Sequence, residues 1–192
     1  VYFSVDKTYV VAFYRKAINA NDKARINDIV NIHRNRIFTS DAVGQYWTAF
    51  FAWPTKIVEW KGLTGIVIPF YDKKFFFDGI DPSWPFIKNG QEKNGKWFSS
   101  AKLINKFVPV NQKGTFLSRL HMCLKIARAM RRLHAAGLAH SDLSYNNVLV
   151  DPLSGNACII DCDGLVVPHK FPPEVVGTPG FIAPEVLATQ AL

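Results

Sequence analysis

The stretch "HSDLSYNNVLV" (residues 140–150) decides how the rest of the chain is interpreted. It places Asp142 five residues before Asn147, and an aliphatic run follows directly. Taken alone, either residue is typical of a polar turn that leads into a buried strand. The alternative is a loop in which the carboxylate and the amide carry chemistry. The residues that follow along the chain separate these two interpretations.

A second acidic position follows the next predicted strand. The letters "NVLV" predict a strand, "DPLSGN" predicts a turn, and "ACII" predicts a second strand that runs into "DCDG" at 161–164. Asp161 is therefore expected at the end of a strand, near the loop that carries Asp142 and Asn147. Phosphoryl transfer needs a carboxylate that orients the attacking hydroxyl and oxygen ligands that hold Mg²⁺ on the phosphates. These three side chains supply that set.

The length and composition are those of an ordinary globular protein. The 192 residues, 48% hydrophobic and 20% charged, are enough for one large domain or two small lobes. The longest apolar run, "GIVIPF", is far shorter than the roughly 20 residues that span a bilayer. With no signal-peptide pattern at the start, we expect a cytoplasmic protein with no membrane partner. The first residue, Val1, indicates a piece of a longer polypeptide.

The net charge of +8 is compatible with anionic partners such as ATP phosphates, acidic proteins or nucleic acid. Lys125, Arg128, Arg131 and Arg132 fall on one side of a predicted helix rather than in a dense basic arm. This spacing is explained at least as well by a solvated helix face as by a nucleic-acid groove. We therefore do not expect nucleic acid as a partner of this segment.

The N-terminal part of the chain predicts a small lobe. Residues 1–16 are β-rich runs around an Asp-Lys turn, and 55–70 contain a second hairpin that turns near Lys61-Gly62. Between them, "NDKARINDIVNIHR" (21–34) opens with helix-capping residues. Four residues of this helix share one face by helical spacing: Ile26, Ile29, Val30 and His33.

The remaining elements predict a larger, helical part. Residues 72–116 are rich in aromatic side chains, which we expect to pack together, with one short helix after Ser99 or Ser100. Residues 116–137 form the clearest helix, and Gly137 is a natural end for it. One side of this helix is expected to consist of Leu120, Cys123, Ala127, Met130 and His134.

Three motifs in order resemble a known family. "HSDLSYNNVLV" resembles the protein-kinase catalytic loop His-Arg-Asp-Leu-x-x-x-x-Asn, and "IIDCDG" resembles the strand and metal-binding Asp of Asp-Phe-Gly. "GTPGFIAPE" (177–185) is similar to the Gly-Thr-x-x-Tyr-x-Ala-Pro-Glu end of the activation segment. The resemblance implies an α+β, two-lobed protein-kinase-like fold, truncated at both ends. It divides the chain into a small lobe (1–68) without a Gly-rich loop, a hinge (69–71) and a partial large lobe (72–192).

A narrower resemblance concerns one branch of this eukaryotic-type protein kinase superfamily. The Asp-x-Asp form and "FPPEVVGTPGFIAPEV" (171–186) are similar to bacterial kinases encoded beside von Willebrand-A and phosphatase partners in tellurite-resistance-type clusters. It implies such proteins as partners, together with a protein substrate.

The family resemblance implies ATP and Mg²⁺ as cofactors and assigns roles by position. Asp142 would orient the acceptor hydroxyl, while Asn147 and Asp161 would bind Mg²⁺. Asp163 is a second metal candidate, because either Asp of "DCDG" can be aligned with the metal-binding position. We prefer Asp161, which directly follows the apolar strand. Thr178 matches a structural Thr close to the catalytic Asp.

The resemblance also implies an adenine site at the hinge. Ile68 matches the gatekeeper, with the Pro69 carbonyl and the Tyr71 N–H as adenine contacts. The residues expected to enclose the adenine ring are Val1, Val10 and Leu149. Apart from the resemblance, these positions are explained equally well as core.

Several residues depart from the family pattern. The strand Lys that contacts the α- and β-phosphates would fall on Ala12, or on Tyr14 if the register shifts, and no Glu occurs before Glu59. Three basic residues remain candidates for the missing phosphate contact: Lys7, Arg15 and Lys16.

The catalytic loop departs as well. Ser141 replaces the Arg that usually receives an activating phosphate, and Ser144 replaces the Lys that usually touches the γ-phosphate. Thr178 is the one hydroxyl residue between Asp161 and Glu185. We therefore expect control by a partner or adjoining domain rather than by phosphorylation of this segment.

Three functions stay open from the sequence. The first is a protein kinase acting on Ser or Thr. The second is a pseudokinase that binds nucleotide as a scaffold or switch, which the missing basic contacts favour. The third is a small-molecule phosphotransferase of the aminoglycoside or choline type, which lacks the Ala-Pro-Glu found here at 183–185.

Overall fold

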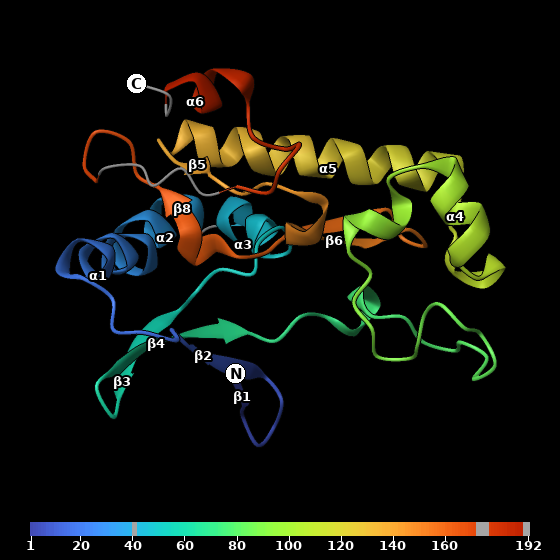
Figure 1. Ribbon diagram of the computed structural model, residues 1–192, viewed down its shortest axis with the longest axis horizontal. Coiled ribbons are helices and arrows are strands. Elements are labelled where there is room, and N and C mark those ends of the chain that lie inside the picture. The colour runs from blue at the N-terminus through green and yellow to red at the C-terminus, as the bar shows by residue number, and fades with distance from the viewer. Residues whose placement is uncertain (40–41, 172–176, 190–192) are drawn as a thin grey trace.

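The computed structural model describes residues 1–39, 42–171 and 177–189. A strand-rich lobe lies at one end and a helical lobe at the other (Figure 1). The sheet of the small lobe is antiparallel, with strand order β1-β2-β4-β3. Its strands are β1 (Tyr2–Phe3), β2 (Tyr9–Phe13), β3 (Lys56–Trp60) and β4 (Leu63–Pro69).

Both hairpins of the small lobe form where the sequence predicts them. Asp6 organises the first turn, because its Oδ1 accepts hydrogen bonds from the Ser4 hydroxyl and from the backbone and hydroxyl of Thr8. The second hairpin turns through Lys61 and Gly62, with φ values of 48° and 76°. Two successive left-handed residues suit the twist of a two-residue hairpin.

The predicted helix over 21–34 is present in three consecutive segments. They are α1 (Ala20–Asn27), the π-helical turn Asp28–His33 and α2 (Arg34–Ile37). The side chain of Asn19 caps α1 by accepting the N–H of Asp22 at 2.8 Å. The predicted face is buried, and Ile26 and Val30 pack with Ile66 of the sheet. The helix therefore connects the sheet to the larger lobe.

Helix α3 (Ala42–Thr48) was not predicted. Its sequence, "AVGQYWT", contains glycine, aromatic and β-branched residues of low helix propensity. Packing of aromatic rings stabilises the helix despite this low propensity. The rings of Tyr46, Trp47 and Phe50 contact one another at centroid distances of 4.9 to 5.2 Å.

The two helices predicted for the large lobe, one after Ser99 or Ser100 and one over 116–137, are both present. Ser100 caps α4 (Ala101–Phe107) by accepting the N–H of Leu103. Thr115 and Ser118 form a capping box at the start of α5 (Phe116–Ala135). Gly137 follows its end with a left-handed φ of 74°.

The side of α5 that the sequence pattern singled out is not its buried side. Most of the predicted residues are exposed, and Met130 is only partly buried. The buried positions of the helix are Ser118, Met122, Ala129 and Leu133. Apolar residues recur at helical spacing on more than one side of α5, so the pattern alone does not select a face. Packing in the core of the large lobe selects it.

Two short strand pairs complete the large lobe. β6 (Val148–Asp151) and β7 (Asn156–Ile159) form the predicted hairpin. β5 (Ala139–His140) pairs with β8 (Leu165–Val166). These pairs place the catalytic-loop candidates and the "DCDG" segment next to each other.

The chain between hinge and α4 packs through its aromatic residues, as expected. Phe77, Ile80, Ile87 and Val108 form a buried cluster with tryptophans against it. Helix α6 (Pro184–Thr189) begins within the activation-segment motif (177–185). Residues 172–176 of the longer stretch 171–186 lie outside the described residues. None of the helices in the described ranges has the length and apolar content of a membrane span.

Candidate active site

The carboxylate of Asp142 is held from two sides. The backbone N–H and the hydroxyl of Thr178 both donate to its Oδ1 at 2.7 Å. Asn147 donates through Nδ2 to Oδ2 at 3.2 Å and to the Asp142 carbonyl oxygen at 2.7 Å. The fold thus brings Asp142, Asn147 and Thr178 together, although Thr178 lies far along the chain.

These contacts lower the pKa of Asp142. The hydrogen bond from the Thr178 hydroxyl is the largest cause, and the Thr178 N–H and the Asn147 amide add to it against a desolvation effect in the other direction. A carboxylate that accepts several hydrogen bonds is stabilised in its charged form. Asp142 is therefore ionised at neutral pH, and Oδ2 retains acceptor capacity for a hydroxyl group.

Glycine allows the activation-segment motif to approach the catalytic loop. A Cβ atom on Gly177 would lie 2.5 Å from Cγ1 of Ile182 and 3.3 Å from the Ser141 carbonyl oxygen. A larger residue here would push the two segments apart. The contact between Thr178 and Asp142 depends on this close approach.

The two serines at unusual positions have structural contacts. Ser144 is 2% exposed, and its hydroxyl accepts the N–H of Asn146 at the start of a short 3₁₀ turn. The hydroxyl of Ser141 donates to the carbonyl oxygen of Gly164 at 3.2 Å. Both serines shape the loop. A buried Ser144 cannot make the phosphate contact of the Lys it replaces.

The carboxylate of Asp161 is unpaired among the described residues and is available to bind a cation. Its φ of 62° is left-handed, and within the described residues its carboxylate has no hydrogen-bond or ion-pair partner. Burial is the main cause that raises its pKa, and the charges of Asp163 and Asp142 raise it further, against a smaller opposite effect of His140. A bound cation would offset each of the causes that raise the pKa.

The donor set fits Mg²⁺ in its usual protein environment. No three His, Cys, Asp or Glu side chains of the described residues form a preformed metal cluster. Mg²⁺ in nucleotide sites is commonly held by one or two carboxylates together with substrate phosphates, so a complete cage is not required. Asp161 and the amide oxygen of Asn147 fit that pattern.

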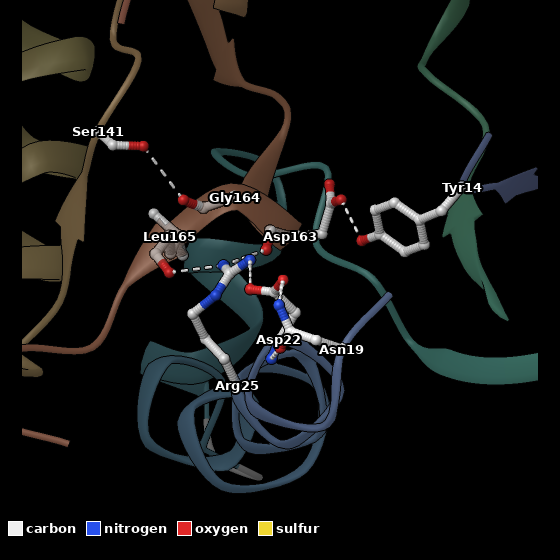
Figure 2. Close-up of polar contacts among 8 residues, drawn as sticks. All are labelled: Tyr14, Asn19, Asp22, Arg25, Ser141, Asp163, Gly164 and Leu165. Carbon is white, nitrogen blue, oxygen red and sulfur yellow. Dashed lines mark hydrogen bonds and ion pairs between the residues drawn. The ribbon is translucent and has the colours of Figure 1, made fainter. Parts of the chain in front are cut away.

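Asp163 is engaged by the small lobe. The hydroxyl of Tyr14, which directly follows β2, donates to Oδ2 of Asp163 at 2.6 Å (Figure 2). Burial first, and then the charge of Asp163, raise the pKa of Tyr14. Of the two aspartates that the sequence left as metal candidates, Asp161 is the open one and Asp163 has a protein partner.

Arg25 of α1 makes a second connection to the same segment. Its Nη1 donates to the carbonyl oxygens of Asp163 at 2.9 Å and Leu165 at 3.1 Å, and its Nη2 lies 3.5 Å from Asp22 (Figure 2). No sequence pattern singled out Arg25. Tyr14 had one signal, as an alternative position for the missing strand Lys.

The other candidates for the phosphate contact lie elsewhere. Ala12 packs with the buried cluster of Ile26, Val30 and Ile66. Lys7 lies in the β1–β2 turn with a left-handed φ of 55°, while Arg15 and Lys16 are exposed after β2. In the described part of the chain, no hydrogen bond or ion pair connects these three basic residues to the catalytic loop.

The adenine-site candidates are only partly assembled. Ile68 and Tyr71 pack against the same buried cluster as Leu149, which is 0% exposed. Val10 pairs with Ile68 across the sheet, and the Pro69 position ends β4. Val1 is 77% exposed. Leu149 presents no surface to a nucleotide in this arrangement, because the cluster covers it.

Comparisons with known proteins find similarity to protein kinases. Residues 101–192 match the protein kinase domain family. Dual specificity testis-specific protein kinase 1 of Rattus norvegicus is 42% identical over 78 residues, covering 36% of this chain and 12% of the relative. Serine/threonine-protein kinase D2 of Rattus norvegicus is 36% identical over 86 residues, covering 42% of this chain and 10% of the relative. Each curated relative is therefore matched over a small part of its own length.

A solved structure shows the fold. The crystal structure of a kinase domain superposes with a TM-score of 0.55 at 15% identity, covering 98% of this chain and 53% of that chain. The chain therefore spans about half of that kinase domain. It has the two-lobed, α+β protein-kinase fold, and residues 101–192 are similar to the protein kinase domain family.

Proposed function

We propose that the chain is part of an ATP- and Mg²⁺-dependent kinase that transfers the γ-phosphoryl group of ATP to Ser or Thr of a protein substrate. The observation that carries this proposal is the Asp142 carboxylate, fixed by Thr178 on one oxygen and by Asn147 on the other. A fixed, ionised carboxylate can accept a hydrogen bond from an alcohol and orient its oxygen for attack.

The roles of the neighbouring residues follow from their contacts. Asp161 and the Oδ1 atom of Asn147 would hold Mg²⁺, which supplies charge neutralisation on the phosphates. The Nδ2 atom of Asn147 holds Asp142 at the same time, so this residue couples the metal position to the position of the acceptor hydroxyl. Asp163 serves as an anchor rather than as a ligand, because Tyr14 occupies its Oδ2.

The protein-kinase reaction is favoured over a small-molecule phosphotransferase by the activation-segment motif. Ala183 directly precedes α6, and Pro184 and Glu185 are its first two residues. The curated relatives are protein kinases by name. The bacterial branch, the von Willebrand-A and phosphatase partners and a cytoplasmic location belong to the same proposal. The branch and the partners rest on the resemblance of the Asp-x-Asp form and of residues 171–186.

A pseudokinase is the second candidate, and two observations favour it. Tyr14 stands at one of the possible strand-Lys positions and contacts Asp163. Leu149, expected beneath the adenine, is fully buried. A protein that only binds nucleotide as a switch would need neither the strand Lys at the α- and β-phosphates nor fast phosphoryl transfer.

Phosphoryl transfer with γ-labelled ATP and Mg²⁺ tests the two candidates. The purified protein is incubated with a generic protein substrate and with candidate partners, beside Asp142→Asn and Asp163→Asn variants. Asp142→Asn keeps the size of the side chain but removes its charge, so transfer should fall by about 10² or more. Asp163→Asn should retain measurable transfer, because an amide oxygen can still accept from Tyr14.

The same assay separates the outcomes. Transfer that survives Asp142→Asn would refute the assigned role of this residue. Saturable nucleotide binding by the wild-type protein without transfer to itself or to any substrate would identify a pseudokinase.

A further inference from the structure

Three arginines of α5 surround one pocket beside α3. The pocket has a volume of about 230 Å³ and is lined by Trp47, Arg128, Arg131, Arg132 and Ala135. None of these residues belongs to the catalytic loop or to the segment around Asp161. The proposed phosphoryl transfer therefore does not account for the pocket.

Aromatic rings hold two of the arginines in place. The guanidinium of Arg128 lies 5.4 Å from the ring centroid of Tyr46, and that of Arg132 lies 5.6 Å from the ring centroid of Trp47. Such stacking orders a planar guanidinium and leaves its edge free to donate hydrogen bonds. The cost of ordering these side chains on binding a ligand is correspondingly reduced.

Arg132 is anchored further and still has an unused donor. Its Nη2 donates to the carbonyl oxygens of Arg36 at 2.8 Å and Ile37 at 2.9 Å, at the end of α2. Its Nε–H is buried and has no hydrogen-bond partner among the described residues. Buried donors are nearly always paired with a protein group or an ordered water, so an acceptor is expected beside this group.

Among the described residues, the pocket carries positive charge without a matching carboxylate. Helix α5 contains no Asp or Glu, and no ion pair within the described residues involves Arg128, Arg131 or Arg132. Arginines near a helix C-terminus are also favoured by the helix dipole. That effect, however, requires neither stacking on aromatic rings nor a shared pocket.

We propose that this pocket binds a phosphorylated serine or threonine side chain of a partner protein. A phosphate monoester brings a charge of about −2 and three acceptor oxygens, which several converging guanidinium groups can satisfy together. A single carboxylate offers fewer acceptors and half the charge. A single pocket lined by three arginines, rather than an extended track of basic residues, favours one phosphate over a nucleic-acid backbone. The Trp47 ring supplies an apolar wall for the carbon atoms of the bound residue.

Fluorescence anisotropy with short labelled peptides tests the proposal on the purified protein. The probe is a peptide with one phosphoserine between glycine and alanine residues. Its unphosphorylated form and its glutamate form are the comparison peptides. The phosphorylated peptide should bind, and inorganic phosphate should compete with it. The Arg128→Ala/Arg131→Ala double variant should weaken binding by about tenfold or more, because hydrogen bonds to charged groups are lost.

Two further variants control for charge and folding. Arg128→Lys/Arg131→Lys keeps the charge but removes the planar donors, and it should bind between the wild-type protein and the alanine variant. Lys102→Ala/Lys106→Ala removes two exposed charges from α4 and should bind like the wild-type protein. All the arginine positions changed are exposed, so circular dichroism and melting should be unaltered.

Several results would overturn the proposal. They are no binding of the phosphorylated peptide, equal binding of the glutamate or unphosphorylated peptide, or an equal loss in the α4 control variant. No catalytic activity is needed for any of these measurements, so the outcome is independent of the proposed kinase function.

Discussion

The Tyr14 hydroxyl lies 2.6 Å from Oδ2 of Asp163, and this hydrogen bond joins the small lobe to the segment that follows Asp161. Arg25 joins the same segment to helix α1 through two backbone carbonyls. Protein kinases use a Lys–Glu pair between a small-lobe strand and a helix. Here a Tyr and an Arg connect that strand and helix to the large lobe instead.

Loss of the Tyr14 hydroxyl should weaken the connection between the lobes. Tyr14→Phe leaves the ring in place and removes the bond to Asp163, so we expect a loss of about 1–3 kcal/mol in the free energy of unfolding. Urea denaturation measures this loss. Tyr9→Phe, at an exposed position of β2, is the matched control and should be within about 0.5 kcal/mol of the wild-type protein. Equal stability of the two variants would contradict a structural role for the bond.

Arg25 and Tyr14 should act together on the Asp163 segment. Arg25→Ala removes the donors to two carbonyl oxygens and should destabilise by about 1–3 kcal/mol. The double variant Tyr14→Phe/Arg25→Ala should cost less than the sum of the single losses, because either change alone already loosens the segment. A double-mutant cycle in urea measures the coupling, and strict additivity would show that the two connections are independent. Lys23→Ala, which breaks an exposed ion pair of the same helix, is the control.

The pH dependence of transfer should respond to Thr178. The Thr178 hydroxyl is the largest cause that lowers the pKa of Asp142, and Thr178→Val removes it while the backbone N–H remains. The pKa of Asp142 should therefore rise toward its ordinary value. Because only the ionised carboxylate accepts the substrate hydroxyl, the acidic limb of kcat/KM should move to higher pH. The stability that this bond supplies to the charged form is present above the unfolded-state pKa, and it is lost as the pH falls through the folded-state pKa.

An unchanged acidic limb in Thr178→Val would mean that another group sets it. Thr48→Val is the control, because its exposed hydroxyl donates to the Gln45 carbonyl oxygen and, within the described residues, makes no hydrogen bond to the catalytic loop. Its pH profile should match that of the wild-type protein.

Asp161 and Asp163 should differ in their response to Mg²⁺. Burial and two neighbouring carboxylates raise the pKa of Asp161, so its charge is unfavourable in the metal-free protein at neutral pH. Asp161→Asn should therefore raise the melting temperature without metal and abolish the further stabilisation by Mg²⁺ with ATP. Asp163→Asn should keep that stabilisation.

The stabilisation expected from Asp161→Asn in the metal-free protein should also depend on pH. Because the folded-state pKa of Asp161 is raised, its contribution is complete below the unfolded-state pKa and is lost as pH rises through the folded-state pKa. The gain from Asp161→Asn should thus appear at neutral pH and disappear in acid. If Asp163→Asn lost the stabilisation by Mg²⁺ with ATP and Asp161→Asn kept it, Asp163 rather than Asp161 would be the metal ligand.

Local patterns in the sequence were sufficient for much of the fold. Turn residues and alternating β-formers predicted the hairpins, and Ser100 and Gly137 marked a helix start and a helix end that the structure confirms. The order of Asp142, Asn147 and Asp161 was enough to propose phosphoryl-transfer chemistry. These features depend on neighbours within a few residues, and such interactions can be inferred without knowing the fold.

Contacts between distant segments were decided only by the tertiary structure. Helix α3 forms through packing of its aromatic rings, and the buried face of α5 depends on the core of the large lobe. Tyr14 meets Asp163, and Arg25 meets the carbonyl of Leu165, across 149 and 140 residues of sequence. The sequence by itself therefore determined which chemical groups were available and where several of its strands and helices begin. Only the folded chain decided that Asp161 stays open while Asp163 is held, because that choice depends on which side chains the two lobes bring into contact.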